Sequence, residues 1–492
     1  MYGGTVNSIF GGSNETGDVN GTVNINLQGG LVKNDVFGGG FGENTRIVGN
    51  VNVQTKTSNN SSLNLNNIYG GSSNGKVNVE NGNYNTNVTI DGGTITGAVY
   101  GAGEGSVQSP ETYGNINVEI KSGIINEVFG GNNMLGSVPK NGKKMLVSIS
   151  GGTINNVYGG SNGAEASATS TNIKMTGGTI NEAIYGGGNE ASTNGTSNID
   201  ISGGFFKEGA AIYGGGQSAI VNYSVINLFD GASVYDVYGG SNFKGNLRSS
   251  TINANGGEIA CNLYGGGNEA TVDNTYVNLN GSKFTYNLKE GETIYSSKCG
   301  KAFGGGNNAE VNVTSNVTLD GSSAISVYGG SNQSGDNLKS IINLKSGTAQ
   351  AIFGGNNVGG SMTESNIIVK QDDGKDLVLE NVFGGNNAGG ITVKTKIDIL
   401  SGQINGDVFG GGNNASVSDS TKVSMYGGTV RSLYGGGNLS FVGQARADSE
   451  GKFIEGIKPG NTEVNVISGV VNRNVYGSGN ASVVYGSTFV NV

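Results

Sequence analysis

An aromatic residue followed by a glycine-rich turn recurs seventeen times along this chain, usually reading Tyr/Phe-Gly-Gly-Asn or Tyr/Phe-Gly-Gly-Gly-Asn. Successive aromatic positions are most often 25 to 32 residues apart. A nearly fixed period of this length is typical of stacked-repeat architectures, in which each repeat contributes one structural unit. The repeated aromatic positions are Phe10, Phe37, Tyr69, Tyr100, Phe129, Tyr158, Tyr185, Tyr213, Tyr238, Tyr264, Phe303, Tyr328, Phe353, Phe383, Phe409, Tyr434 and Tyr476.

The segments between the turns alternate apolar and polar residues, which is the pattern of a half-buried β-strand. Residues 23–27, 199–201 and 464–466 are examples of this alternation. No comparable stretch has the 3.6-residue period of an amphipathic helix. A second turn signal, Gly-Gly-Thr, recurs in many repeats, as at residues 92–94 and 151–153. Glycine tolerates positive φ, so these turns are suited to sharp corners between strands.

Three short strands and three corners in about 25 residues correspond to one coil of a parallel β-helix. We therefore predict an all-β fold, a parallel β-helix (β-solenoid) of about 17 coils with about 25–30 residues per coil. A single coil buries too few apolar side chains to be stable alone, so neighbouring coils must complete its core. Because the repeat extends through almost the whole sequence, we expect residues 1–492 to form a single elongated repeat domain.

The composition supports a β-fold built from repeats. Glycine accounts for 93 of the 492 residues, yet no Gly-X-Y period is present, which excludes a collagen triple helix. Only three prolines occur. Proline removes a backbone donor from a β-ladder, so its scarcity favours strands over a proline-rich stalk.

The repeat pattern is interrupted by insertions near residues 284–299 and 443–460. We interpret each insertion as a loop or hairpin that leaves the repeat core, and loops of this kind are the likelier places for specific binding. Residues 1–6 are identical to residues 425–430, and the final residues also lie inside a repeat. We therefore expect both ends to be cut within a repeat, either in a longer array or in a subunit with uncapped, stackable ends.

The aromatic row has two interpretations. The rings could pack at the corners of the solenoid, or they could form an exposed platform on which sugars stack. Phenylalanine and tyrosine interchange freely among the seventeen positions, so the hydroxyl group is not required. This interchange favours packing at a structural corner ladder.

Asparagines follow the glycines in most repeats, and stacking would place them in a row. They could form a hydrogen-bonded ladder, as in cross-β structures, or each could adopt a left-handed corner conformation. Both interpretations give them a structural role. The asparagines are Asn14, Asn133, Asn162, Asn189, Asn242, Asn268, Asn308, Asn332, Asn357, Asn387, Asn414, Asn438 and Asn480.

Cys261 and Cys299 are the only cysteines, and they lie shortly before the aromatic residues of consecutive repeats. Stacking could bring the two thiols together as a disulfide. Their positions relative to the aromatic residues differ by one, however, which could direct them to opposite faces. The sequence leaves both outcomes open.

Several classes of chemistry have no support in the sequence. Histidine is absent, which removes histidine-based triads, general bases and metal sites. The glycine turns lack the regular aspartates of calcium-binding nonapeptides and the lysine and helix of phosphate loops. We therefore predict that the chain is not an enzyme and has no catalytic, cofactor-binding or metal-binding residues.

The charge pattern limits the partners. Charged residues are only 13% of the chain, and the formal net charge is −9 without a basic cluster. Nucleic acid is therefore not an expected partner. No stretch of about 18 apolar residues is present, so we expect no membrane insertion.

Blocks such as Ile-Tyr-Gly-Gly-Gly-Asn at 184–189 and Gly-Gly-Thr-Ile at 151–154 resemble the repeats of large bacterial cell-surface proteins, the adhesin-like and autotransporter-passenger β-solenoids. The resemblance covers nearly the whole chain. It implies secretion, an extracellular or cell-surface location, and a structural or adhesive role as a stalk, shaft or fibre module. A host or matrix glycan or protein would be the partner. The alternatives are a glycan-binding or glycan-cleaving β-helix and a filament subunit that self-associates head to tail.

Overall fold

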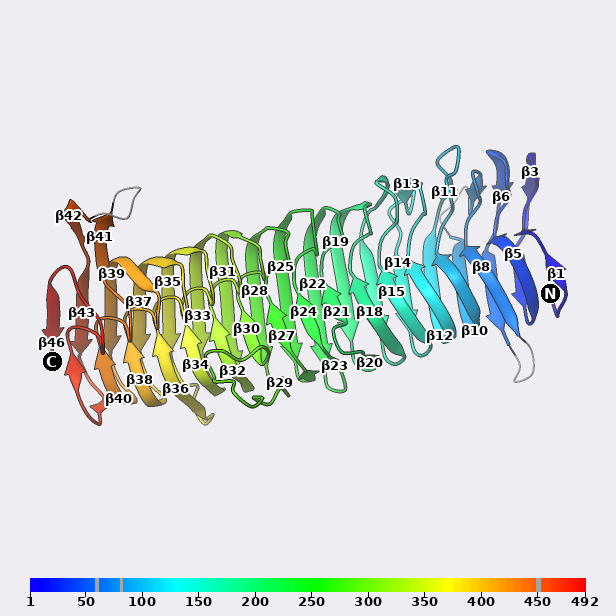
Figure 1. Ribbon diagram of the computed structural model, residues 1–492. Helices are drawn as coiled ribbons and strands as arrows, with labels where there is room; N and C mark the ends of the chain where they lie inside the picture. Colours follow the sequence, from blue (N-terminus) through cyan, green and yellow to red (C-terminus); the bar gives the residue numbers. More distant parts are fainter. Residues whose placement is uncertain (58–61, 80–82, 448–452) are drawn as a thin grey trace. The chain divides into compact units, whose positions relative to one another are not determined.

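A computed structural model of the chain describes residues 1–57, 62–79, 83–447 and 453–492. It contains two compact units, Met1–Arg248 and Ser249–Val492. In both units short parallel strands stack coil upon coil, and the described residues contain no helix (Figure 1). The predicted parallel β-solenoid of about 17 coils is confirmed.

Each coil of the first unit passes through up to three rows of strands. The first row precedes the second turn signal and comprises β4 (Val23–Leu27), β7 (Val51–Lys56), β14 (Met145–Ile149), β17 (Thr171–Met175) and β22 (Val221–Phe229). The second row leads to the repeated aromatic residue and comprises β1 (Thr5–Val6), β2 (Ile9–Phe10), β5 (Gly30–Phe37), β8 (Leu63–Tyr69), β15 (Thr153–Tyr158), β18 (Thr179–Tyr185), β20 (Phe205–Phe206), β21 (Ala211–Tyr213), β23 (Ser233–Val234) and β24 (Asp236–Tyr238).

Some strands of this unit continue through a corner, and a third row follows the glycine turn. The strands β10 (Asn85–Tyr100) and β12 (Asn115–Phe129) run from the first row into the second. The third row comprises β3 (Thr16–Val19), β6 (Asn44–Ile47), β9 (Lys76–Val77), β11 (Glu111–Thr112), β13 (Leu135–Val138), β16 (Glu165–Ala168) and β19 (Ser192–Ile201), the last of which continues into the first row.

The second unit repeats the first two rows. Its first row comprises β28 (Val272–Asn280), β31 (Val311–Asp320), β33 (Asn337–Leu344), β35 (Ser361–Val369), β37 (Ile391–Ile399), β39 (Ser416–Met425), β43 (Asn461–Val466) and β46 (Thr488–Asn491); the strand β25 (Leu247–Asn255) contains the boundary between the units. Its second row comprises β26 (Glu258–Ile259), β27 (Asn262–Tyr264), β29 (Lys283–Phe284), β30 (Lys301–Phe303), β32 (Ser322–Tyr328), β34 (Gly347–Phe353), β36 (Leu377–Phe383), β38 (Gln403–Phe409), β40 (Thr429–Tyr434), β44 (Val470–Val471) and β45 (Val475–Tyr476).

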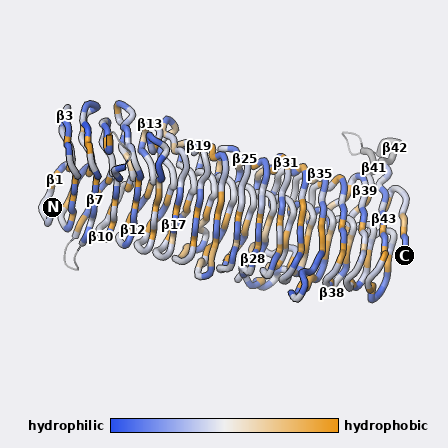
Figure 2. The backbone as a smooth tube through the Cα atoms, turned by 180° about the vertical axis from the view of Figure 1, so that it is seen from behind, coloured by the Kyte–Doolittle hydropathy of each residue, from blue (hydrophilic) through white to orange (hydrophobic). Residues whose placement is uncertain are grey.

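The core of each unit is made of aliphatic side chains that lie in register from coil to coil. In the second unit, Ile367 pairs with Ile397, Ile397 with Val423, and Val423 with Val464. All four side chains are buried. Figure 2 shows apolar segments recurring at corresponding places in successive coils. The alternation seen in the sequence therefore places one face of each strand inside the coil.

Glycine is required for different physical reasons in the two kinds of turn. In the Gly-Gly-Thr turns the second glycine has positive φ, as at Gly152 (85°) and Gly178 (92°). The glycines after the aromatic residue mostly lack positive φ; instead they allow close approach between coils. A Cβ at Gly38 would overlap the carbonyl oxygen of Gly70 in the next coil. The expectation that conformational freedom explains the glycines of both turns is thus correct only for the Gly-Gly-Thr turn.

Candidate functional site

The seventeen repeated aromatic rings form face-to-face stacks. In the first unit consecutive ring centroids lie 4.4–5.0 Å apart with interplanar angles of 2–11°. In the second unit the distances from Tyr264 to Tyr476 are 4.7–5.0 Å and the angles 4–16°. These distances match the spacing of about 4.8 Å between adjacent strands. Within a stack both faces of each internal ring lie against other rings, so a flat ligand can reach only ring edges.

The asparagines form a second ladder beside the rings. In the first unit Asn162 donates to Asn133 Oδ1 at 2.8 Å, and Asn189 donates to Asn162 at 2.9 Å. In the second unit side-chain amide bonds of 2.8–3.0 Å join Asn268, Asn307, Asn332, Asn357, Asn387, Asn413, Asn438 and Asn480 in sequence.

This ladder decides between the two interpretations of the asparagines. Asn78 is the only residue other than glycine with positive φ in the described part of the chain, so no ladder asparagine is left-handed. The prediction is wrong for Asn308 and Asn414, because Asn307 and Asn413 make the ladder bonds in those coils. Where two asparagines follow three glycines, the first one, Asn307 or Asn413, occupies the ladder because it is the fourth residue after the aromatic.

Hydrogen bonds connect the two ladders across two coils. Asn133 donates to the Tyr69 hydroxyl at 3.0 Å, the Tyr158 hydroxyl donates to Gln217 Oε1 at 2.6 Å, and Asn387 donates to the Tyr328 hydroxyl at 3.4 Å. Burial raises the pKa of Tyr158 and Tyr328. These tyrosines therefore stay neutral and act as hydrogen-bonding groups at the ring edges.

The ring edges form the floor of a concavity that we call the corner groove. It is lined by ring edges, by residues two positions before a ring and by residues four positions after a ring. In the first unit a section of about 310 Å³ is open; it is lined by Glu127, Asn156, Tyr158, Glu182, Ala183, Tyr185, Asn189, Gly209, Ala211, Tyr213 and Gln217.

Two carboxylates give this open section a negative charge. Asn156 Nδ2 donates to Glu182 at 2.6 Å. Burial, followed by the charge of Glu182, raises the pKa of Glu127. A cation placed in the groove would relieve the repulsion between the two carboxylates.

In the second unit the chain itself lies over the equivalent ring edges, which we call the covered section. Tyr295, from the 284–299 insertion, lies edge-on to Phe353 and Phe383, with centroid distances of 6.3 and 6.0 Å. Asn381 donates to its hydroxyl at 3.2 Å, and Asn387 donates to its backbone carbonyl at 3.2 Å. The insertion was expected to leave the core, but this part of it folds back because the groove offers ring edges and amide donors.

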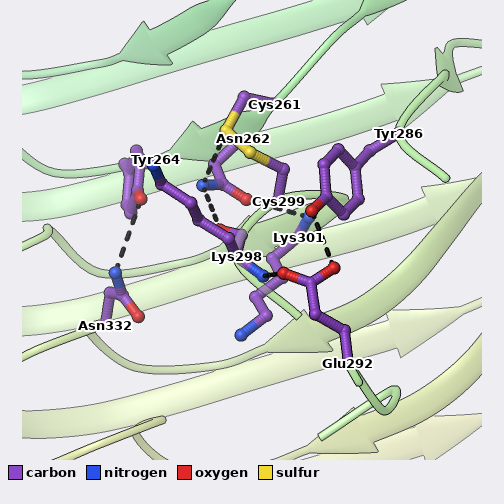
Figure 3. The surroundings of a disulfide bond; sticks show 9 residues. All are labelled: Cys261, Asn262, Tyr264, Tyr286, Glu292, Lys298, Cys299, Lys301 and Asn332. Carbon is purple, nitrogen blue, oxygen red and sulfur yellow. Dashed lines mark hydrogen bonds between the residues drawn. A yellow bond between two sulfur atoms is a disulfide. The ribbon is translucent and has the colours of Figure 1, made fainter. Parts of the chain in front are cut away.

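A disulfide lies at the C-terminal end of the insertion (Figure 3). Cys261 and Cys299 are bonded, and their Cα atoms are 4.4 Å apart. Asn262 donates to the carbonyl of Lys298 at 3.2 Å, and Glu292 accepts a hydrogen bond from the Tyr286 hydroxyl at 2.7 Å. The disulfide and the Asn262 hydrogen bond tie the insertion to the coil beneath it, whereas the Tyr286–Glu292 hydrogen bond lies within the insertion.

Lys301 follows this disulfide and is buried, with an exposed fraction of only 4%. Its Nζ lies 5.8 Å from the centroid of the Tyr328 ring, within reach of a cation–π interaction. Burial lowers the pKa of Lys301 to about 8, and the negative charge of Glu292 partly offsets this effect.

The other insertion forms an antiparallel hairpin of β41 (Gly443–Ala447) and β42 (Phe453–Pro459). Gly443 pairs with Pro459. The part of this predicted insertion at 448–452 lies outside the described residues.

The sequence did not single out Glu127, Glu182, Gln217, Tyr295 or Lys301. Four of them lie at fixed offsets from a repeated aromatic residue: Glu127 and Lys301 two before, Glu182 three before, and Gln217 four after. A comparison of the repeats position by position would have shown the charges of Glu127, Glu182 and Lys301 and the replacement of asparagine by Gln217. Tyr295 belongs to no repeat position, so only the structure places it.

In the described part of the chain, no three cysteine, aspartate or glutamate side chains are grouped so that they could hold a metal ion. Within those same residues no helix is long and apolar enough to cross a membrane. The stacked coils and their two ladders define a parallel β-solenoid. No family model matches the chain, and neither a curated protein nor a solved structure matches it.

Proposed function

We propose that this β-solenoid is a non-catalytic structural and adhesive repeat region of an extracellular or cell-surface protein, serving as a stalk, shaft or fibre module. The observation that carries this proposal is the continuity of the ring stack within each unit, with the amide ladder beside it from Asn133 to Asn189 in the first unit and from Asn268 to Asn480 in the second. Most of the recurrent aromatic and amide side chains pack or bond to the next coil. Such side chains stabilise a repetitive scaffold and leave few groups for chemistry.

The disulfide between Cys261 and Cys299 supports the extracellular location. Disulfides persist in oxidising environments and are rare where thiols are kept reduced. The resemblance of the repeats to bacterial surface proteins points to the same location.

Labelling of intact cells tests this location. A membrane-impermeant amine reagent should label the protein on cells that express it from its own gene, whereas a cytosolic control protein should stay unlabelled. When free thiols are trapped with an alkylating reagent at lysis, no cysteine of the protein should be labelled. Protection from the reagent together with two free thiols would contradict the proposal.

A ligand screen separates the scaffold from a glycan-binding or glycan-cleaving function. A ligand that binds only the folded state raises the melting temperature through linkage. The scaffold function predicts an unchanged melting temperature with soluble polysaccharides at millimolar sugar. A dose-dependent rise, or release of reducing sugar, would favour the glycan alternative instead.

A further inference from the structure

We propose that the open section of the corner groove in the first unit binds a peptide segment of a partner protein in which a lysine or arginine precedes a tyrosine by three residues. The 284–299 insertion of the second unit provides the template, because it seats Tyr295 in the equivalent section of its own groove. The inference goes beyond the scaffold function and does not depend on the location of the protein.

The two sections share their ring floor and the hydrogen bond at its edge. Three consecutive rings form each floor: Tyr158, Tyr185 and Tyr213 in the open section, and Tyr328, Phe353 and Phe383 in the covered one. In both sections the residue four after the third ring bonds to the hydroxyl of the first ring. That residue is Gln217 in the open section and Asn387 in the covered one.

Two of the three donors that hold the insertion have counterparts; the third, Asn381, which donates to the Tyr295 hydroxyl, corresponds to Ala211. Ser326 Oγ donates to the carbonyl of Ile294 at 3.2 Å, and Asn387 donates to that of Tyr295 at 3.2 Å. Asn156 and Gln217 occupy these positions in the first unit. Gln217 accepts from Tyr158 through Oε1, so its amide group can donate to a peptide carbonyl. The groove therefore presents the chemistry that a bound backbone needs.

Charge distinguishes the two occupants. In the coil before each section, the residue two positions before the repeated ring carries a charge. This residue is Lys301 beside the covered section and Glu127 beside the open section. Lys301 Nζ lies 5.8 Å from the centroid of the Tyr328 ring, the first ring of the covered section, and the negative charge of Glu292, three residues before Tyr295, raises the pKa of Lys301. Since Glu127 has the opposite sign and Glu182 adds a second carboxylate, the occupant of the open section should carry a cation where the insertion carries Glu292.

Peptide binding to the full chain tests the proposal. The probe is a fluorescein-labelled synthetic peptide of residues 289–298 with Glu292→Lys. Two control peptides are used. The first is the same segment with its native Glu292, and the second is the probe with the additional change Tyr295→Ala. The probe should bind with a dissociation constant below about 1 mM, the affinity expected of a small site. Each control should bind at least about tenfold more weakly.

A charge reversal in the chain makes the test specific to this groove. Glu127→Lys should weaken binding of the probe at least about tenfold and should now favour the peptide with native Glu292. Asp18→Lys, at an exposed site in the same unit, changes the net charge equally and should leave probe binding unchanged; unchanged melting temperatures show that both variants are folded.

Equal binding of the lysine and glutamate peptides would overturn the proposal. Indifference to Glu127→Lys, or absence of probe binding up to about 1 mM, would also overturn it. Displacement of the probe by a neutral oligosaccharide that itself loses affinity for the Glu127→Lys variant would assign the groove to glycans.

Discussion

At the scale of single residues, each repeated aromatic ring is stabilised mainly by the rings above and below it. Phe353 is fully buried and stacks on Tyr328 at 4.7 Å and on Phe383 at 4.9 Å. Such contacts use ring area and not the hydroxyl group, which explains why tyrosine and phenylalanine interchange. The tyrosines add hydrogen bonds to the amide ladder where they occur.

Truncation of a ring inside the stack should be costly. Phe353→Ala removes a fully buried ring between two others, so we expect a loss of about 3–5 kcal/mol in the free energy of unfolding. Tyr476→Ala is the matched control, because this ring ends the stack and has an exposed fraction of 41%. Chemical denaturation of both variants measures the difference; equal losses would contradict the packing account.

Lys301 should make stability depend on pH. Burial lowers its pKa in the folded state to about 8, while in the unfolded chain the lysine keeps its ordinary pKa of 10.5. Between these values the unfolded state binds more protons, so stability rises as pH increases. The full gain corresponds to about 3 kcal/mol, although buried tyrosines oppose it above about pH 10.

Lys301→Met provides the comparison for this pH effect. Methionine fills a similar volume without a charge, so the variant should lack the rise in melting temperature between about pH 8 and pH 9.5. Thermal unfolding of wild type and variant across this window measures the effect. Parallel pH profiles would show that Lys301 is not responsible.

At the scale of strands and turns, the glycines after each ring matter because coils approach closely there. Gly38→Ala would place a Cβ against the carbonyl oxygen of Gly70 and should cost about 1–3 kcal/mol. Gly21→Ala is the control in the same unit, since a Cβ there meets no atom within 4 Å. Melting temperatures measure both changes, and an equal response would refute close approach as the reason.

The disulfide should hold the 284–299 insertion on the groove. It closes a separation of 38 residues, so Cys261→Ser combined with Cys299→Ser should lower the free energy of unfolding by about 2–4 kcal/mol. Hydrogen exchange should accelerate at residues 294–299 and stay slow in β34. Unchanged exchange in the insertion would mean that the groove contacts alone hold it.

At the scale of the whole molecule, the sequence predicted the fold because a period-two pattern within a 25–32-residue period has few structural solutions. It also placed Phe353 and Asn357 in rows that the structure contains. It could not place Tyr295, because that contact joins residues 58 and 88 positions apart through a non-repeating loop. The prediction of one elongated domain over residues 1–492 remains a prediction.

The central claim is that one sequence repeat is one coil in parallel register, and cysteine pairs test it directly. In the second unit Lys396 pairs with Lys422, whereas Ser420 lies two residues away on the same face. Directly paired positions are close enough for a disulfide, whereas positions offset by two residues are about 7–8 Å apart. Lys396→Cys with Lys422→Cys should therefore form a disulfide under mild oxidation.

The control is Lys396→Cys with Ser420→Cys, which should stay reduced. In the first unit the equivalent experiment pairs Lys174→Cys with Asp200→Cys and uses Asn198→Cys as the offset partner. Mass spectrometry of proteolytic fragments identifies each bond. We predict disulfides in the two registered pairs and free thiols in the two offset pairs; bonds in the offset pairs, or equal yields in all four, would contradict the account.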